Sequence, residues 1–269
     1  MATVDARQSR ALIAIETSTA VGSVALAREQ GGRLVCEALA EGGQEPSRRV
    51  LAMVESLLAG AGLAASSLDA IAFDAGPGSF TGIRIGVGVA QGIGFAVSVP
   101  LIGVSSLEIL ATAALAGAAA RADRASPAPA RLVLAAIDAR MGQVYCGVFR
   151  QAGARARLVD AIAVCDPLEA VARFERALQA GAGGARALAG IAAGDAFTVH
   201  APLGEWVESE PLERATVGAP DAATLARIAM AKLGAGETVA ASDAAPIYVR
   251  DKVALDVREQ RALRAGATR

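Results

Sequence analysis

The stretch Ile13–Ala27, IAIETSTAVGSVALA, decides the fold, because a related stretch returns later in the chain. The second copy is Ala135–Phe149, AAIDARMGQVYCGVF, and it places Asp138 where the first copy has Glu16. Each copy has a continuous apolar run, an acidic residue, a short turn and a second apolar run. This is the pattern of a buried strand and its hairpin partner. A duplication of this size predicts two related lobes.

The segments around each copy predict a mixed sheet flanked by helices. In the first half we expect strands at 11–17, 21–28, 33–40, 69–74 and 99–104, and helices at 47–62, 81–97 and 105–120. In the second half we expect strands at 132–138, 143–150 and 157–164, helices at 166–179 and 221–233, and an extended segment at 246–250. The predicted division is a first lobe at 11–120, a linker at 121–131, a second lobe at 132–250 and a weakly ordered tail at 251–269. The last helix is expected either within the second lobe or packed back on the first.

This order of elements is typical of the actin and sugar-kinase-like (ASKHA) two-lobe fold, in which ATP lies in the cleft between the lobes. Glu16 and Thr17 occupy the first phosphate hairpin of such a fold, and Asp138 its counterpart in the second lobe. The first hairpin has glutamate in place of aspartate and lacks a glycine in its turn. We interpret Glu16, Thr17 and Asp138 as candidates for a degenerate nucleotide site. The alternative is that both carboxylates are turn or capping residues.

Composition excludes several functional classes. The chain has 269 residues, of which 54% are hydrophobic, so it can bury a sizeable core. A net charge of −1 and an aromatic content of 3% argue against unaided binding to nucleic acid. The cysteines Cys36, Cys146 and Cys165 are far apart, which argues against a disulfide framework or zinc ribbon and fits a reducing compartment. The single histidine, His200, is predicted at the surface and cannot supply a two-histidine metal site.

The chain is predicted to be cytoplasmic. The opening MATVDARQSR lacks the apolar core of a signal peptide. The uncharged run Ile85–Val104 is long enough to cross a bilayer. Its glycines, Ser98 and Pro100 divide it into a helix-like half and a strand-like half, so we reject a membrane span.

The stretch Gly76–Gly92, GPGSFTGIRIGVGVAQG, predicts a tight turn leading into an apolar helix. Such a turn can bind phosphate on helix N-terminal amides, but no lysine is near, and we favour a turn capped by Ser79 or Thr81. The helix is apolar nearly all round and must be covered on more than one side. Its glycines repeat at a spacing of four, which lets another helix approach closely. That helix belongs either to the same molecule or to a partner.

The same stretch, followed by PLIGVSSLEILA at Pro100–Ala111, resembles the TsaB family, also called YeaZ. The second copy of the duplication and PIYVR at Pro246–Arg250 agree with this family in order and spacing. The resemblance therefore covers about residues 11–250. The catalytic relative TsaD carries a histidine pair for a metal, whereas this chain has one histidine, as expected of the non-catalytic paralogue.

The resemblance implies a scaffolding subunit with no catalytic residue, metal or cofactor of its own. Its complex transfers a threonylcarbamoyl group to the adenosine 3′ of the anticodon in tRNAs reading codons that begin with A. The implied main partner is TsaD, with the ATPase TsaE as a second, and the chain alone is expected to be able to form a homodimer. The candidate partner-binding residues are Leu51, Val54, Leu58, Arg84, Val87, Gly88, Gln91 and Phe95. The family often has a histidine near Glu45–Ser47, which this chain lacks.

Two rival functions are also compatible with the sequence. The first is an active ATP-dependent carbamoyltransferase or kinase of the same fold, which the altered first hairpin and the missing metal ligands weaken. The second is a peptidase acting on its partner. The absence of a serine or cysteine with a histidine candidate nearby in sequence weakens this reading.

Overall fold

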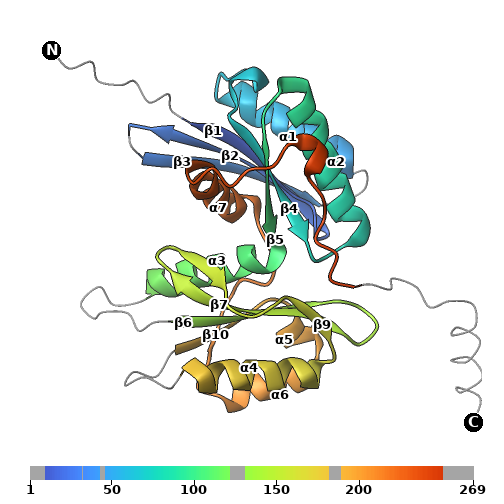
Figure 1. The fold of residues 1–269 in the computed structure, drawn as a ribbon, viewed down its shortest axis with the longest axis vertical. Helices are drawn as coiled ribbons and strands as arrows, with labels where there is room; N and C mark the ends of the chain where they lie inside the picture. The colour runs from blue at the N-terminus through green and yellow to red at the C-terminus, as the bar shows by residue number, and fades with distance from the viewer. Residues whose placement is uncertain (1–9, 32, 43–45, 122–130, 182–188, 251–269) are drawn as a thin grey trace, which may run out of the picture.

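The computed structural model describes residues 10–31, 33–42, 46–121, 131–181 and 189–250. The expected tail at 251–269 and most of the expected linker therefore lie outside the described residues. Glu45, near which the family often has a histidine, lies outside them as well. The described residues form two lobes, each built on one sheet (Figure 1). The predicted fold class, two mixed sheets flanked by helices, is confirmed.

The first sheet has the strand order β3-β2-β1-β4-β5. Its strands are β1 (Ala11–Glu16), β2 (Val21–Gln30), β3 (Arg33–Gly42), β4 (Ala70–Gly76) and β5 (Leu101–Ser105). All six side chains of β1 are buried, as its continuous apolar sequence predicts. β1 pairs antiparallel with β2 and parallel with β4. The parallel pairing brings the carboxyl ends of β1 and β4 to one edge, where the first hairpin meets the loop after β4.

Helices cover both faces of the first sheet. α1 (Pro46–Gly60) and α2 (Phe80–Val97) pack on one face around Ile71 and Phe73. α7 (Ala222–Gly234) packs on the other face, so the last helix returns to the first lobe. α1 begins at Pro46, one residue before its expected cap.

α3 (Ser106–Arg121) departs from the predicted division of the chain. The sequence assigned it to the first lobe, but it buries Leu107, Leu110 and neighbouring alanines against Val133 and Ile137 of the second sheet. α3 and α7 consequently lie between the two sheets (Figure 1).

The second sheet has the order β11-β10-β6-β7-β8, and β9 pairs with β7. Its strands are β6 (Arg131–Asp138), β7 (Val144–Ala152), β8 (Arg155–Leu158), β9 (Ala163–Cys165), β10 (Ala189–Ala193) and β11 (Glu213–Arg214). On its outer face lie α4 (Pro167–Gly181), α5 (Ala196–Val199) and α6 (Ala201–Ser209). Two short 3-10 helices, η1 (Ala65–Ser67) and η2 (Ala241–Asp243), complete the described elements.

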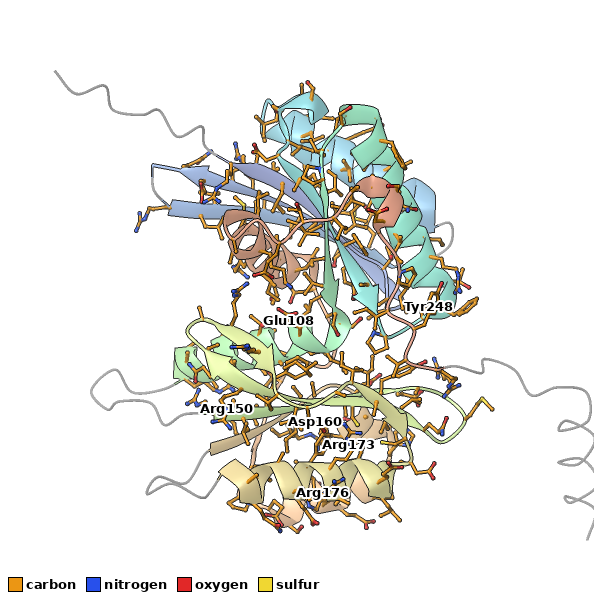
Figure 2. All side chains as sticks on the ribbon, in the orientation of Figure 1. Glu108, Arg150, Asp160, Arg173, Arg176 and Tyr248 are labelled. Atoms are coloured by element: carbon orange, nitrogen blue, oxygen red, sulfur yellow. The ribbon has the colours of Figure 1, made fainter. Side chains whose placement is uncertain are left out.

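The single strand expected at 157–164 is wrong, because a turn separates β8 from β9. Asp160 accepts a hydrogen bond from the amide of Ala161 at 2.9 Å. Arg173 of α4 donates to the Asp160 carboxylate and to the Ala161 carbonyl, both at 2.6 Å (Figure 2). This contact from a later helix fixes the turn. β10, β11, α5 and α6 were not expected, because the alanine- and glycine-rich sequence before His200 shows no clear periodicity.

The uncharged run Ile85–Val104 divides as predicted. α2 ends at Val97, Ser98 has a left-handed φ of 58°, and β5 begins at Leu101. Within the described residues, α2 is the one helix long and apolar enough to cross a membrane by length and composition. One of its faces is buried in the core of the first lobe.

Candidate functional site

Two carboxyl groups are buried where the first hairpin meets strand β4. Glu16 ends β1 and Asp74 lies in the adjacent strand β4, and they are 0% and 1% exposed. Glu16 Oε1 accepts from the amide and hydroxyl of Ser18 at 2.6 and 2.7 Å, and Asp74 Oδ1 accepts from the Ser106 hydroxyl at 2.6 Å. Burial, reinforced by the negative charge of Asp74, raises the pKa of Glu16 to about 8, and burial raises the pKa of Asp74 to about 6. The pair therefore holds a proton at neutral pH.

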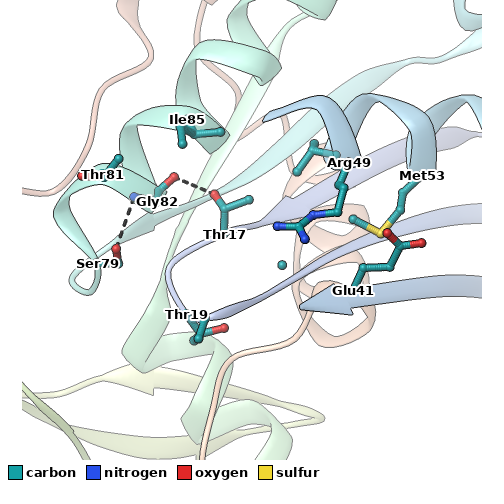
Figure 3. Close-up of a pocket in the computed structure, with 12 residues that line it drawn as sticks. Thr17, Thr19, Glu41, Arg49, Met53, Ser79, Thr81, Gly82 and Ile85 are labelled. Carbon is teal, nitrogen blue, oxygen red and sulfur yellow. Dashed lines mark hydrogen bonds between the residues drawn. The ribbon is translucent and has the colours of Figure 1, made fainter. Parts of the chain in front are cut away.

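The turn after Glu16 interlocks with the loop before α2 (Figure 3). The Thr17 hydroxyl donates to the carbonyl of Gly82 at 2.8 Å, and the amide of Ser79 donates to the carbonyl of Ser18 at 2.9 Å. A β-carbon on Gly82 would lie 2.0 Å from the Thr17 carbonyl oxygen, and one on Gly78 would lie 2.9 Å from Ser18 Cβ. Only glycine fits at such an approach of two backbones.

The contacts between the first hairpin and the start of α2 occupy backbone amides that could otherwise bind a phosphate. The amide of Gly82 donates to the Ser79 hydroxyl, so Ser79, one of the two expected candidates, is the N-cap of α2. The adjoining pocket, of about 290 Å³, is lined in part by Thr17, Thr19 and Arg49. The Arg49 guanidinium donates to the carbonyl of Gly42 at 2.8 Å. The contacts of the Gly76–Gly92 motif thus match a capped turn.

The second hairpin has its own network around Asp138. Its carboxylate accepts from the Arg140 amide at 3.0 Å, and its amide donates to Asp195 at 2.9 Å. His200 Nε2 lies 3.1 Å from Asp138 Oδ1, and the His200 side chain is only 11% exposed. The prediction that His200 is a surface histidine is therefore wrong. The α5–α6 segment brings His200 to the carboxyl end of β6, next to Asp138. Nothing in the sequence around His200 indicated this position.

The three nucleotide-site candidates do not share one site. Asp138 lines a cleft of about 900 Å³ between the lobes, together with Ser18 and Thr19. Thr17 lines the smaller pocket beside α2, and Glu16 lines neither. Within the described residues, no group of three or more His, Cys, Asp or Glu side chains could hold a metal ion.

Residues 239–250, here named the C-terminal strap, run along α2 (Figure 1). Gln91 donates through its amide nitrogen to the carbonyls of Ala241 and Ala244 at 3.0 and 3.2 Å. Arg84 donates to the Tyr248 hydroxyl at 3.0 Å, and its guanidinium lies 3.4 Å from the centre of the Phe80 ring. Both side chains therefore hold the chain's own strap, and their expected contact with a partner stays a prediction. The signal for the strap was the PIYVR motif.

The strap ends on the second lobe. The amide of Ile247 donates to the carbonyl of Ala75 at 2.7 Å. Three residues further on, Arg250 donates to the carbonyl of Ala139 at 3.1 Å and to the Gln143 side chain at 2.8 Å. The strap thus connects α2 with the Asp138 hairpin across the cleft, and sequence reasoning missed this role of Arg250.

The remaining partner-binding candidates divide between core and surface. Three are buried in the core of the first lobe: Val54, Leu58 and Val87. Within the chain these three side chains face the first sheet, and their expected contact with a partner stays a prediction. Leu51 and Phe95 are 44% and 62% exposed. Gly88 is exposed, and a β-carbon added there would meet nothing within 4 Å.

Residues 42–254 match the TsaD family, described as tRNA N6-adenosine threonylcarbamoyltransferase. With the two-lobe architecture and the hairpin at Glu16, this match defines the class: an actin and sugar-kinase-like protein related to the threonylcarbamoyltransferases. Over 256 residues the chain is 31% identical to the tRNA threonylcarbamoyladenosine biosynthesis protein TsaB of Haemophilus influenzae, covering 91% of this chain and 96% of that protein. It is 33% identical over 249 residues to TsaB of Escherichia coli, covering 90% and 96%. The chain belongs to the TsaB (YeaZ) family, as its motifs predicted.

A solved structure agrees with this assignment. YeaZ from Pseudomonas aeruginosa is 34% identical to the chain and superposes with a TM-score of 0.66, covering 89% of this chain and 99% of that one. A second Pseudomonas aeruginosa structure, described as an uncharacterized protein similar to peptidase YeaZ, gives a TM-score of 0.69 at 34% identity, covering 90% and 100%.

Proposed function

We propose that the chain is a non-catalytic scaffolding subunit of the complex that writes threonylcarbamoyladenosine into tRNA, and that it acts by holding TsaD. Family membership supports a role in the synthesis of threonylcarbamoyladenosine, because the relatives at 31–33% identity are named as biosynthesis proteins of this modified nucleoside. The mode of action rests on the geometry of the first lobe.

The observation that carries the proposal is the interlocked first hairpin. In an active nucleotide site, backbone amides at the start of the helix would be free for phosphate. Here the amides of Ser79 and Gly82 bond to the chain itself, and the hairpin carboxylate of Glu16 is buried beside Asp74. These contacts favour a structural hairpin over a catalytic one.

The surface that we assign to TsaD is the α1–α2 face, defined by Leu51, Ile85, Gly88, Gly92 and Phe95. Gly88 and Gly92 are exposed, with no atom within 4 Å of an added β-carbon, so a partner helix can approach the backbone of α2. Leu51 and Phe95 supply exposed apolar area beside them. Two helices from each partner would form a compact contact of about 1,600 Å² in total, a standard size for a specific interface.

The other partners follow from the same proposal. TsaE joins as the ATPase of the complex, and tRNA is met through the complex, because the chain's net charge of −1 offers little phosphate neutralisation. When TsaD is absent, the same apolar face can pair with a second copy of the chain. The complex is proposed to work in the cytoplasm.

The experiment that tests the proposal is reconstitution with tRNA and threonylcarbamoyl-adenylate. The chain alone should yield no modified adenosine, and product should form once TsaD and TsaE are added. Calorimetry on the isolated chain should detect no tight, magnesium-dependent ATP binding. Product formed by the chain alone, with partner contamination excluded by mass spectrometry, would instead establish a catalytic subunit.

A further inference from the structure

Two cysteines that are distant in sequence lie in contact inside the second lobe. Cys146 belongs to β7, and Cys165 is the last residue of β9. The strands pair antiparallel, with Cys146 opposite Ala163 and Cys165 opposite Val144. The two Sγ atoms are therefore diagonal neighbours on one face of the sheet, and they are 3.6 Å apart. The mechanism proposed above uses neither thiol.

The surroundings of the pair favour a covalent bond between its members. Cys146 and Cys165 are 0% and 4% exposed and belong to the core cluster on the outer face of the second sheet. This burial shields them from large reagents and from other protein thiols, so oxidation of the pair requires a brief local opening of β9, which is only three residues long, to admit a small oxidant. Cys36 lies in the first lobe, on β3, and serves as an internal comparison.

We propose that Cys146 and Cys165 form a reversible disulfide when the protein meets a peroxide. The Sγ atoms need to approach from 3.6 Å to a bond length of about 2.0 Å, and bond formation requires the side chains and the short strand β9 to shift enough to close this gap. The site is thus a two-electron oxidation site whose oxidant is a small hydroperoxide and whose reductant is a dithiol.

The chemistry proceeds in two balanced steps. The Cys165 thiolate attacks one peroxide oxygen, an S–O bond forms, the O–O bond breaks, and the leaving hydroxide takes up a proton to become water. The Cys146 sulfur then attacks the sulfenic sulfur, an S–S bond forms, and the S–O bond breaks. The second hydroxide leaves as water with the proton of Cys146. Two thiols are oxidised by two electrons, and one peroxide is reduced to two waters.

The environment assigns the first attack to Cys165. The contact with the Cys146 sulfur lowers the pKa of Cys165, and the positive charge of Arg173 acts in the same direction against burial and the acidic Glu169 and Asp166. The same sulfur–sulfur contact and burial raise the pKa of Cys146. Cys165 is also the more exposed of the two. The nucleophile and the resolving thiol are therefore distinct.

The sequence makes the product easy to detect. Trypsin places each cysteine in a separate peptide: Cys36 in Leu34–Arg48, Cys146 in Met141–Arg150 and Cys165 in Leu158–Arg173. The native full-length protein is treated with hydrogen peroxide, quenched, alkylated under denaturing conditions and digested. We expect the second and third peptides joined, with a mass lower by two hydrogens than their sum, and released by dithiothreitol. The oxidised protein should also melt about 5 °C higher, because the bond closes a loop in the unfolded chain.

Variants decide the interpretation. Cys36→Ser should leave the linked peptide pair unchanged, and Cys146→Ala should abolish it and leave Cys165 on the path to sulfinic acid. If Cys146→Ala does not fold, the peptide map of the oxidised Cys36→Ser protein still shows whether Cys146 and Cys165 are linked. Recovery of Met141–Arg150 and Leu158–Arg173 as separate, alkylated peptides after native oxidation would overturn the proposal. A bond that involves Cys36 or a second chain would overturn it as well.

Discussion

The burial of Glu16 makes the stability of the first lobe depend on pH. A carboxyl group whose pKa in the folded protein lies above its unfolded value stabilises the fold fully below the unfolded pKa, and this contribution is lost as pH rises through the folded pKa. For Glu16 the window runs from its ordinary value of 4.5 to about 8, since burial and Asp74 oppose the charged form. The hairpin is therefore most stable while the carboxyl pair holds its proton.

Replacement of Glu16 by glutamine removes this titration. Between pH 6 and 8 the melting temperature of the wild type should fall more steeply than that of Glu16→Gln, by about 5 °C over the interval. Thermal melts in matched buffers measure the difference, and Glu55→Gln on the exposed side of α1 is the control. Parallel pH profiles of wild type and Glu16→Gln would show that Glu16 is ionised in the folded protein.

At the scale of the element, α2 has three distinct faces, two of which are covered within the chain. One face, with Ile83, Val87 and Ala90, packs on the first sheet and α1. A second holds the C-terminal strap through Arg84 and Gln91. The third, with Gly88 and Gly92, remains exposed. The apolar composition of the helix follows from its contacts on the first face and from a partner proposed for the third.

Gly88→Leu tests the third face. The side chain would project from the α1–α2 face, because no atom lies within 4 Å of the added β-carbon. We expect binding to TsaD to weaken at least tenfold while the melting temperature stays the same or rises, since leucine favours helix more than glycine does. Calorimetry with TsaD and a thermal melt measure both effects.

The matched control for this variant is Ala231→Leu, on an exposed position of α7. It adds a similar side chain to another helix of the same lobe and should bind TsaD normally. A folded Gly88→Leu protein with unchanged affinity would remove α2 from the proposed interface. An unfolded one would place Gly88 inside the lobe and shift the interface to α1.

At the scale of the whole molecule, the strap links the lobes on the side of α2. It leaves α7, pairs through Val239 with Leu101, follows α2 and ends with Arg250 on the Asp138 hairpin. Each of its hydrogen bonds contributes about 1 kcal/mol, so several in series hold the segment in place. The strap therefore restricts relative movement of the cleft walls near α2.

Arg250→Ala should release the second lobe from the strap. The amide of Ala139, which donates to the Gln143 carbonyl at 2.9 Å, should exchange about tenfold faster, because the hairpin loses the three hydrogen bonds that Arg250 donates to it. Hydrogen-exchange mass spectrometry over residues 139–143 measures this rate. The control is Arg150→Ala, at an exposed position of β7 in the same lobe (Figure 2). Unchanged exchange in Arg250→Ala would show that the strap does not support the hairpin.

The sequence by itself determined the duplicated strand hairpins, most helix and strand positions and the family, because each depends on local periodicity or on a contiguous motif such as Gly76–Gly92. That the first hairpin is a degenerate nucleotide site stays a prediction from the sequence. Only the tertiary structure decided which side of α2 is free, that Arg84 and Gln91 hold the strap, and that His200 meets Asp138. The same holds for α3 on the second sheet and for the Cys146–Cys165 contact. These contacts join residues separated by as many as 164 positions, and a local pattern carries no information about which distant surface will cover it.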